Sequence, residues 1–135
     1  MIRVVIDTNV VVSAALQHLG QPAAVIRLVT SSDIVACVSE PILAEYREVL
    51  SRTRIGVDPT RAALIQDLLI STGVLVSPSV TVTECKDPDD DMFLECALAA
   101  RASFLITGNS AHFPTQFKAT KIVTPREFLE AWHKS

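Results

Sequence analysis

A single aspartate and a cluster of four aspartates occupy positions where a carboxylate destabilises the fold unless a positive charge lies beside it. Asp7 follows the apolar run Ile2–Ile6, and four aspartates fall within the five residues 87–91, directly before an almost wholly apolar stretch. Burial disfavours a charged carboxylate, and neighbouring carboxylates repel one another. A hard divalent cation such as Mg²⁺ relieves both penalties because it prefers oxygen ligands. The pattern therefore predicts a metal site that could activate water for attack on a phosphodiester.

Three acids are the candidate metal ligands and catalytic residues: Asp7, Glu45 and Asp91. On a predicted helix over residues 41–52, Glu45 lies one turn from Ile42, at the margin of the apolar face, so its carboxylate can reach a shared site. Asp91 lies in the first turn of a later helix, beside apolar residues, and is the aspartate of its group expected to face the protein. Glu48 points outward and serves as the comparison residue.

Each acid also has a structural explanation that the sequence alone leaves open. Asp7 could be the N-cap of the helix after the first strand. Asp89 could cap the later helix, where the macrodipole favours acidic side chains, while Asp87 and Asp90 stay solvated. Glu45 could be a solvated glutamate that forms local ion pairs. Four aspartates in one short segment nevertheless exceed what a helix start requires.

Polar residues at two predicted strand ends could support such a site. Thr8 and Asn9 directly follow Asp7, and Thr107 and Asn109 end a strand predicted over residues 103–107. Ligands of open parallel sheets bind beyond the carboxyl ends of the strands. These side chains are therefore expected at the same edge, where they could approach a phosphate or orient the acids.

Alternating apolar runs predict an α/β fold with three layers, α/β/α, and a mostly parallel central sheet of four to five strands. Strands separated by helices require right-handed crossovers, which cover both faces of such a sheet. Predicted strands lie at 2–6, 33–38, 103–107 and 121–123, with one or two extended pieces within 74–82. Predicted helices lie at 9–17, 22–30, 41–52, 59–73, 89–102 and 125–133.

Composition limits the class of protein. With 135 residues, of which 49% are hydrophobic, the chain is expected to form one domain over residues 1–135 rather than to be disordered. The apolar runs are too short to span a membrane, and Asp7 interrupts the one that a signal peptide would need. Three cysteines without a C-x-x-C spacing indicate neither a disulfide framework nor a structural zinc site. A cytoplasmic location is therefore expected.

Net charge does not decide whether the chain binds nucleic acid. The formal charge is −3, and the three candidate ligands contribute −3 between them, so the remainder sums to zero. If a metal neutralises those acids, the rest of the surface does not repel a polyanion such as RNA.

The ordered set of motifs resembles PIN-domain proteins, and within them the branch of toxins from toxin–antitoxin systems that is related to VapC. It comprises hydrophobic-Asp-Thr-Asn at the N-terminus, a central glutamate, Asp-Pro-Asp-Asp-Asp at 87–91 and Thr-Gly-Asn-x-x-His-Phe-Pro at 107–114. The resemblance implies a PIN fold and a Mg²⁺- or Mn²⁺-dependent ribonuclease, with Asp7, Glu45 and Asp91 as its first three acids. The fourth acid of the family is often an aspartate; here Asn109 replaces it, with His112 nearby, which leaves a weaker ligand for a second metal ion.

Partners follow from the same resemblance and from apolar helix surface. RNA is the expected substrate, an antitoxin protein is the expected inhibitor, and a homodimer is the expected assembly. Two neighbouring helices carry generous apolar surface that serves either core packing or a groove for a second copy or an inhibitory peptide: Val49, Leu50, Leu64, Ile65, Leu68 and Leu69.

Other functions stay open or are disfavoured. A catalytically degenerate PIN fold that serves as a binding scaffold is favoured only by Asn109, and a PIN nuclease of RNA processing would carry the same acids as a toxin. Aspartyl-phosphate phosphatases need a second acid at the position of Asn9. Receiver-like phosphoacceptors need a lysine at a late strand end, whereas Lys121 begins a strand.

Overall fold

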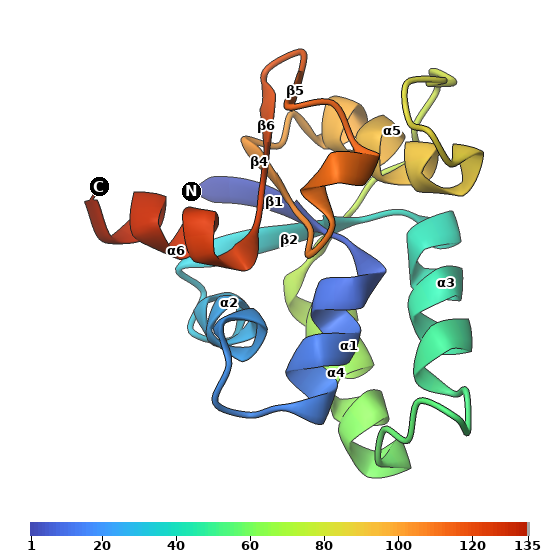
Figure 1. Ribbon diagram of the computed structural model, residues 1–135, viewed down its shortest axis with the longest axis vertical. Coiled ribbons are helices and arrows are strands. Elements are labelled where there is room, and N and C mark those ends of the chain that lie inside the picture. The colour runs from blue at the N-terminus through green and yellow to red at the C-terminus, as the bar shows by residue number, and fades with distance from the viewer. Residues whose placement is uncertain (135) are drawn as a thin grey trace.

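A twisted sheet runs through the centre of the molecule in the computed structural model, which describes residues 1–134 (Figure 1). Over these residues the sheet has six strands in the order β3-β2-β1-β4-β6-β5. Neighbouring strands are parallel except β5 and β6, which are antiparallel. The strands are β1 (Ile2–Ile6), β2 (Ile34–Val38), β3 (Val74–Leu75), β4 (Phe104–Ile106), β5 (Gln116–Phe117) and β6 (Thr120–Val123).

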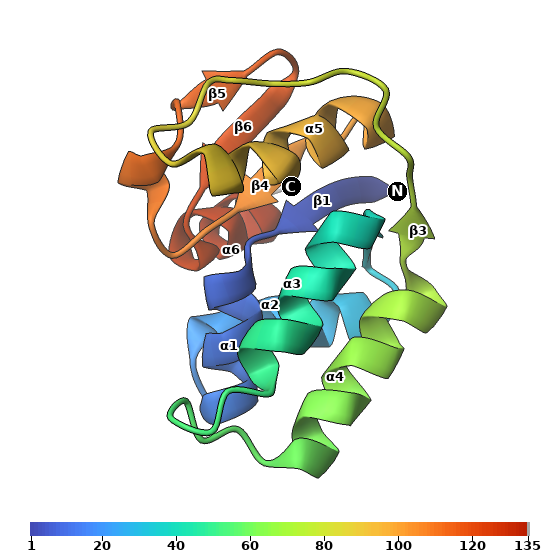
Figure 2. The ribbon, with the colours of Figure 1, turned by 90° about the vertical axis from the view of Figure 1, so that its right-hand side faces the viewer.

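Helices lie on both faces of this sheet, so the predicted three-layer α/β architecture is confirmed. In Figures 1 and 2, α5 lies on one face, and α2 and α6 lie on the other, while α1, α3 and α4 pack on one another. The helices are α1 (Thr8–Leu16), α2 (Gln21–Thr30), α3 (Glu40–Leu50), α4 (Pro59–Thr72), α5 (Asp91–Ala100) and α6 (Pro125–Lys134). Short 3-10 turns, η1 (Pro88–Asp90) and η2 (Ser110–His112), precede α5 and follow β4.

The sheet is wider than the four to five strands predicted, because β5 was not expected. This strand has two residues and turns back onto β6 through Lys118, whose φ is 55°. The predicted extended pieces within 74–82 reduce to β3. The Val76 N–H still donates to the Val38 carbonyl at 2.8 Å, but Pro78 has no N–H with which to continue pairing.

The central strands and α5 form the core of the described residues. Val4, Val5 and Leu105 are fully buried, as are Phe93 and Leu94 of α5. Strands of a parallel sheet lose water on both faces, which explains why the inner half of β1, from Val4 to Ile6, is wholly apolar and buried. No helix among residues 1–134 combines the length and apolar character needed to cross a membrane.

Gly73 is the one glycine whose missing side chain is essential for packing. It ends α4 and leads into β3, and a Cβ atom placed on it would lie 2.3 Å from the Leu69 carbonyl oxygen and 2.8 Å from that of Ala36. Both are backbone atoms, which cannot move aside as a flexible side chain can. The close approach brings α4 directly onto β2.

We expect Gly73→Ala to destabilise the protein by about 1–3 kcal/mol, because the added methyl group forces the backbone of α4 away from β2. Urea denaturation followed by circular dichroism measures the free energy of unfolding. Gly20→Ala is the matched control, because its Cβ would only make ordinary contacts, at 3.5 Å from the Pro22 Cδ atom. Equal losses in the two variants would contradict this explanation.

Candidate active site

Asp7 lies at the carboxyl end of β1 and is 6% exposed. Its backbone N–H donates to the Ile106 carbonyl at 2.9 Å, and the Thr107 hydroxyl donates to its Oδ2 atom at 2.8 Å. Although Asp7 is the N-cap residue of α1, its side chain makes no capping hydrogen bond. Helix capping therefore does not account for a carboxylate at this position.

The pKa of Asp7 shows that other acids lie near it. Burial is the largest cause that raises this pKa, to about 6, and it is opposed by the hydrogen bond from Thr107. The negative charges of Asp90 and Glu45 raise the pKa further. Charges on a 3-10 turn and on α3 therefore act on the carboxylate at the end of β1.

Glu45 is half-buried on α3, at the margin of the helix face that buries Ile42 and Tyr46. The Thr8 hydroxyl donates a hydrogen bond to its Oε2 atom. Glu48 points into solvent, where its Oε2 atom lies 2.7 Å from Nη2 of Arg52. The two glutamates of this helix thus differ in the way that the helical pattern predicts.

α3 is fastened to the site end of β1 by a second contact. The buried Tyr46 hydroxyl donates to the Ile6 carbonyl, one residue before Asp7. Burial raises the pKa of Tyr46 well above its ordinary value, so the phenol stays protonated and able to donate. The positions of Asp7 and Glu45 are therefore set by the same pair of elements.

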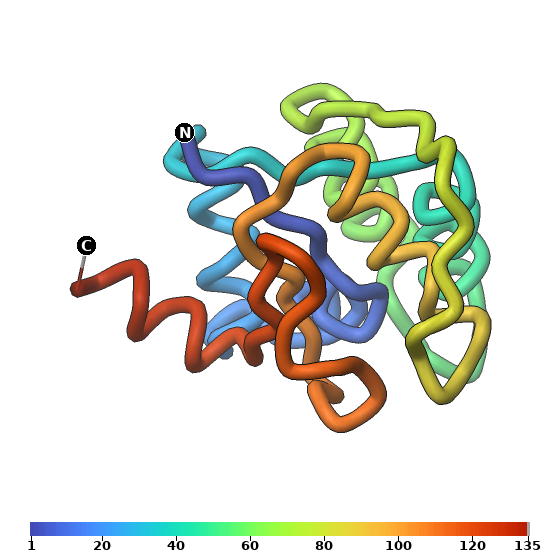
Figure 3. Tube along the Cα trace, turned by 90° about the horizontal axis from the view of Figure 1, so that it is seen from above, coloured from blue at the N-terminus to red at the C-terminus, as the bar shows by residue number. Residues whose placement is uncertain are grey.

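Asp91 is 7% exposed, and its side chain holds a neighbouring segment. Its Oδ1 atom accepts hydrogen bonds from the backbone N–H groups of Glu84, at 3.1 Å, and Cys85, at 2.8 Å. These residues belong to the segment that joins β3 to α5 and runs beside α5 (Figures 2 and 3). Asp91 also lines an open cleft of about 510 Å³ that Glu45 shares.

Asp90 is the aspartate that faces His112, with 20% of its side chain exposed. Its pKa is raised, chiefly by burial and then by Asp87, with a smaller contribution from Glu45, and is lowered by His112. The sequence placed Asp90 in solvent, but it lies three, four and seven residues before the fully buried Phe93, Leu94 and Ala97. Extending that buried face backward by one turn would have indicated it.

The helix start also differs from the predicted one. Asp87 caps the 3-10 turn η1, because its Oδ1 atom accepts a hydrogen bond from the Asp89 N–H at 3.0 Å, and Asp90 rather than Asp89 is the N-cap residue of α5. The resulting 3-10 turn delays the start of α5 to Asp91. The prediction that Asp91 is the third acid of the site stays a prediction, and Asp90 becomes a second candidate for the position.

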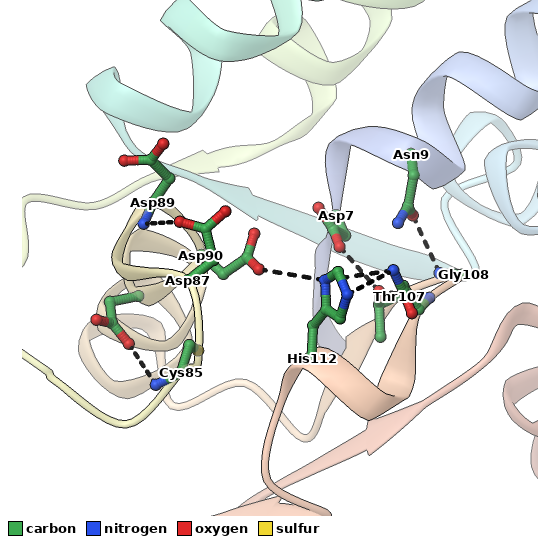
Figure 4. A network of polar contacts seen from close by, with 11 residues as sticks. Asp7, Asn9, Cys85, Asp87, Asp89, Asp90, Thr107, Gly108 and His112 are labelled. Atoms are coloured by element: carbon green, nitrogen blue, oxygen red, sulfur yellow. Dashed lines mark hydrogen bonds and ion pairs between the residues drawn. The ribbon is translucent and has the colours of Figure 1, made fainter.

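The four predicted supporting residues all contact the site end of the sheet. Besides the contacts of Thr8 and Thr107 already described, the Thr107 Oγ1 atom accepts a hydrogen bond from the Asn109 N–H at 3.0 Å. The Asn9 Oδ1 atom accepts one from the Gly108 N–H at 3.0 Å. Figure 4 shows Thr107 beside Asp7 and Asn9 facing Gly108. The two strand ends are thus joined through side chains.

Asn109 and His112 form a further polar contact that the sequence did not predict. The Asn109 amide nitrogen lies 3.2 Å from Nδ1 and 3.1 Å from Nε2 of the His112 ring. The His112 Nδ1 atom lies 3.7 Å from Oδ2 of Asp90 (Figure 4). His112 therefore stands between the end of β4 and the start of α5.

The acids suit a hard divalent cation in their chemistry, although they form no closed cage. Among residues 1–134, no three or more His, Cys, Asp or Glu side chains are arranged to hold a metal ion. Asp7 and Glu45 are each turned to a threonine hydroxyl instead. Mg²⁺ is commonly held by one or two carboxylates, together with water and substrate phosphate, so a complete protein cage is not required.

Comparison with known proteins identifies a family and a relative. The family described as "PIN domain" matches residues 3–111, a range that holds Asp7, Glu45, Asp90, Asp91 and Asn109. The chain is also similar to the uncharacterized protein MJ1680 of Methanocaldococcus jannaschii. The two are 31% identical over 146 aligned residues, which cover 98% of this chain and 93% of that protein.

In metal-free buffer, we expect the contribution of Asp7 to folding stability to fall as the pH rises from about 4 to above 6. The pKa of Asp7 is about 6 in the folded protein, against an ordinary value of 3.8. The folded state therefore binds more protons between these values, so this stability is complete below the lower pKa and is lost as the pH passes the upper one. The separation corresponds to about 3 kcal/mol.

Urea denaturation of the wild type and Asp7→Asn in EDTA, at pH 4 and pH 7.5, measures this effect. The variant should lose the part of the pH dependence that Asp7 causes, and it should be the more stable protein at the higher pH. Glu48→Gln serves as the control because Glu48 is exposed. An identical pH dependence in the wild type and Asp7→Asn would contradict the assigned cause.

Proposed function

Because the chain belongs to the PIN-domain family, whose members are generally nucleases, we propose that it is a Mg²⁺- or Mn²⁺-dependent endoribonuclease that hydrolyses phosphodiester bonds. The observation that carries this proposal is the Asp7 carboxylate at the end of β1, whose pKa is raised chiefly by burial and then by the charges of Asp90 and Glu45. Carboxylates gathered in this way destabilise the metal-free protein and favour binding of a cation.

We assign Asp7 and Glu45 as metal ligands and catalytic residues, with Asp90 or the predicted Asp91 as the third acid. A divalent cation, when bound there, supplies a Lewis acid that polarises phosphate oxygens and lowers the pKa of water. Of the two aspartates, Asp90 fits better, because the Oδ1 atom of Asp91 already accepts two backbone hydrogen bonds while Asp90 acts on the pKa of Asp7.

The chain's own residues orient these acids and leave space for a substrate. Thr107 and Thr8 donate to Asp7 and Glu45, which restricts how the two carboxylates can rotate. The open cleft of about 510 Å³ beside Glu45 and Asp91 has the size of a small-molecule site. An unpaired nucleotide would fit such a space, and sequence-specific proteins bind RNA mostly in single-stranded regions. That the substrate is RNA rests on the family resemblance.

We expect Asp7→Asn and Glu45→Gln to lower Mn²⁺-dependent cleavage of a single-stranded RNA by about 100-fold or more, because each removes a charged ligand. A gel assay with an end-labelled RNA measures the rate, with Glu48→Gln as a control of equal chemistry on the outer face of α3. Equal cleavage by the wild type, Asp7→Asn and Glu45→Gln would show a contaminating nuclease and exclude an enzyme that uses these acids. That result would instead favour a catalytically degenerate PIN fold that serves as a binding scaffold.

Asp90→Asn and Asp91→Asn, compared in the same assay, identify the third acid. If Asp90 holds the metal, Asp90→Asn loses cleavage but keeps the stability of the fold. Asp91→Asn should then lower the melting temperature, because its neutral oxygen is a weaker acceptor for the Glu84 and Cys85 N–H groups. Asp91→Asn inactive at full stability, beside an active Asp90→Asn, would assign the site to Asp91 instead.

We further propose that the nuclease is the toxin of a toxin–antitoxin pair and that an antitoxin protein binds it. The resemblance to VapC-related toxins supports this, as does apolar surface that is open to solvent. Leu64 is 64% exposed and lines a cleft of about 330 Å³ between α1, α2 and α4, whereas Leu50, Ile65 and Leu69 are buried. Leu19, in the turn between α1 and α2, is 88% exposed.

Expression in a bacterial host separates a toxin from a nuclease of RNA processing. We expect induced wild-type protein to arrest growth because it cleaves cellular RNA, and Asp7→Asn to permit normal growth at the same protein level. Colony counts measure growth, and immunoblots measure the protein level. Light scattering on the purified chain tests the proposed homodimer. Unimpaired growth with active, soluble wild-type protein would favour RNA processing.

A further inference from the structure

The corner of the site formed by Asn109 and His112 carries hydrogen-bond donors where the family resemblance leads one to expect a fourth acid. Asn109 follows the end of β4 and brings an amide, which has no charge. Its nitrogen contacts the His112 ring at 3.1–3.2 Å. This corner therefore has one carboxylate fewer with which to bind a divalent cation. It has N–H groups that can donate hydrogen bonds to an anion.

His112 has donor capacity left beyond its contacts in the structure. Its Nδ1 atom lies 3.7 Å from the Asp90 carboxylate, which is longer than a hydrogen bond. About half of the side chain is exposed, at 52%, so a further group can reach it. A neutral imidazole has one N–H, and that donor is present in both charge states of the ring. Binding of an acceptor at this position does not depend on protonation.

The charge distribution favours a donor at this position. The charges of Asp90 and Glu45 act on Asp7, and that of Glu45 acts on Asp90, and each of these carboxylates repels an incoming phosphate. Among the charges that act on the pKa of Asp90, His112 is the one that lowers it. Asn109 and His112 are exposed, whereas Asp7 is buried and most of the Asp90 side chain is covered, so the amide and the ring are the more accessible groups for a phosphate. Figure 4 shows the ring between Asp90 and the strand end that carries Thr107 and Gly108.

We propose that Asn109 and His112 bind a non-bridging oxygen of an RNA backbone phosphate beside Asp90, and that the site consequently works with one divalent cation. This inference rests on the proposed nuclease function. The two residues would act in place of the positive charge that a second cation brings to two-metal sites, where the pair of ions clamps the reacting phosphate. Asn109 follows the end of β4 as the N-cap residue of η2, and His112 is the last residue of η2.

Mn²⁺ stoichiometry tests whether the site works with one divalent cation, without any measurement of activity. Isothermal titration calorimetry should find one Mn²⁺ per wild-type chain and two per Asn109→Asp chain, because the substitution adds a carboxylate at the same place. Asp7→Asn should bind none in the same range. Two ions on the wild-type protein, or one on Asn109→Asp, would overturn the one-cation inference.

Steady-state cleavage of a short single-stranded RNA tests the phosphate-binding role of His112. His112→Ala should lower kcat by about 100-fold, the loss that follows removal of one donor to a reacting oxygen, and should keep the Mn²⁺ stoichiometry and melting temperature of the wild type. His112→Gln retains an N–H donor and should recover at least about tenfold of that loss. His133→Ala, on the exposed side of α6, is the matched control. Unchanged kcat in His112→Ala would overturn the phosphate-binding role.

The two levels of proposal fail in different ways. If wild-type protein binds no Mn²⁺ and cleaves no RNA, the nuclease function is excluded and this inference with it. If Mn²⁺ binds through Asp7 and RNA is cleaved, but Asn109→Asp and His112→Ala behave like the wild type, the nuclease function stands and the phosphate-binding corner alone is excluded.

Discussion

Carboxylates brought close together at one edge of a sheet are the constraint that shapes this molecule. Asp7 is nearly buried, and the charges of Asp90 and Glu45 act on it. Such an arrangement opposes folding unless donors or a cation compensate for it. Threonine hydroxyls provide part of that compensation, through Thr107 at Asp7 and Thr8 at Glu45. The rest is left to whatever cation or substrate the site binds, and this coupling links the stability of the fold to its function.

The parallel sheet explains how residues a hundred positions apart come to share a site. Ile6 and Ile106 are paired in register, so the residues that follow them, Asp7 and Thr107, leave the sheet side by side. The buried Tyr46 hydroxyl holds α3 to the same strand end. The close packing of Gly73 onto β2 fixes α4 behind it. The buried core therefore sets the positions of the groups that we propose as catalytic.

Replacing an acid by an amide at position 109 changes what one corner of the site can bind. A carboxylate there would add to the repulsion among Asp7, Glu45 and Asp90 and would call for more positive charge. Asn109 instead contacts His112, whose ring lies beside Asp90. The two proposals are therefore complementary. The bound cation accounts for the acids, and the phosphate-binding corner accounts for the uncharged amide at position 109.

Local pattern was sufficient for the architecture and for the residues whose neighbours in sequence define them. The apolar run before Asp7, the helical face beside Glu45 and the outward position of Glu48 follow from periodicity alone, because periods of two and 3.6 fix which side chains share a face. Strand β5 was missed because two residues carry too little pattern. The helical period of α5 points back to Asp90, but only the tertiary structure shows that the Asp91 carboxylate is engaged elsewhere. A 3-10 turn sets the rotation of the helix start, and the N–H groups of Glu84 and Cys85 occupy Asp91, through contacts that no local pattern encodes.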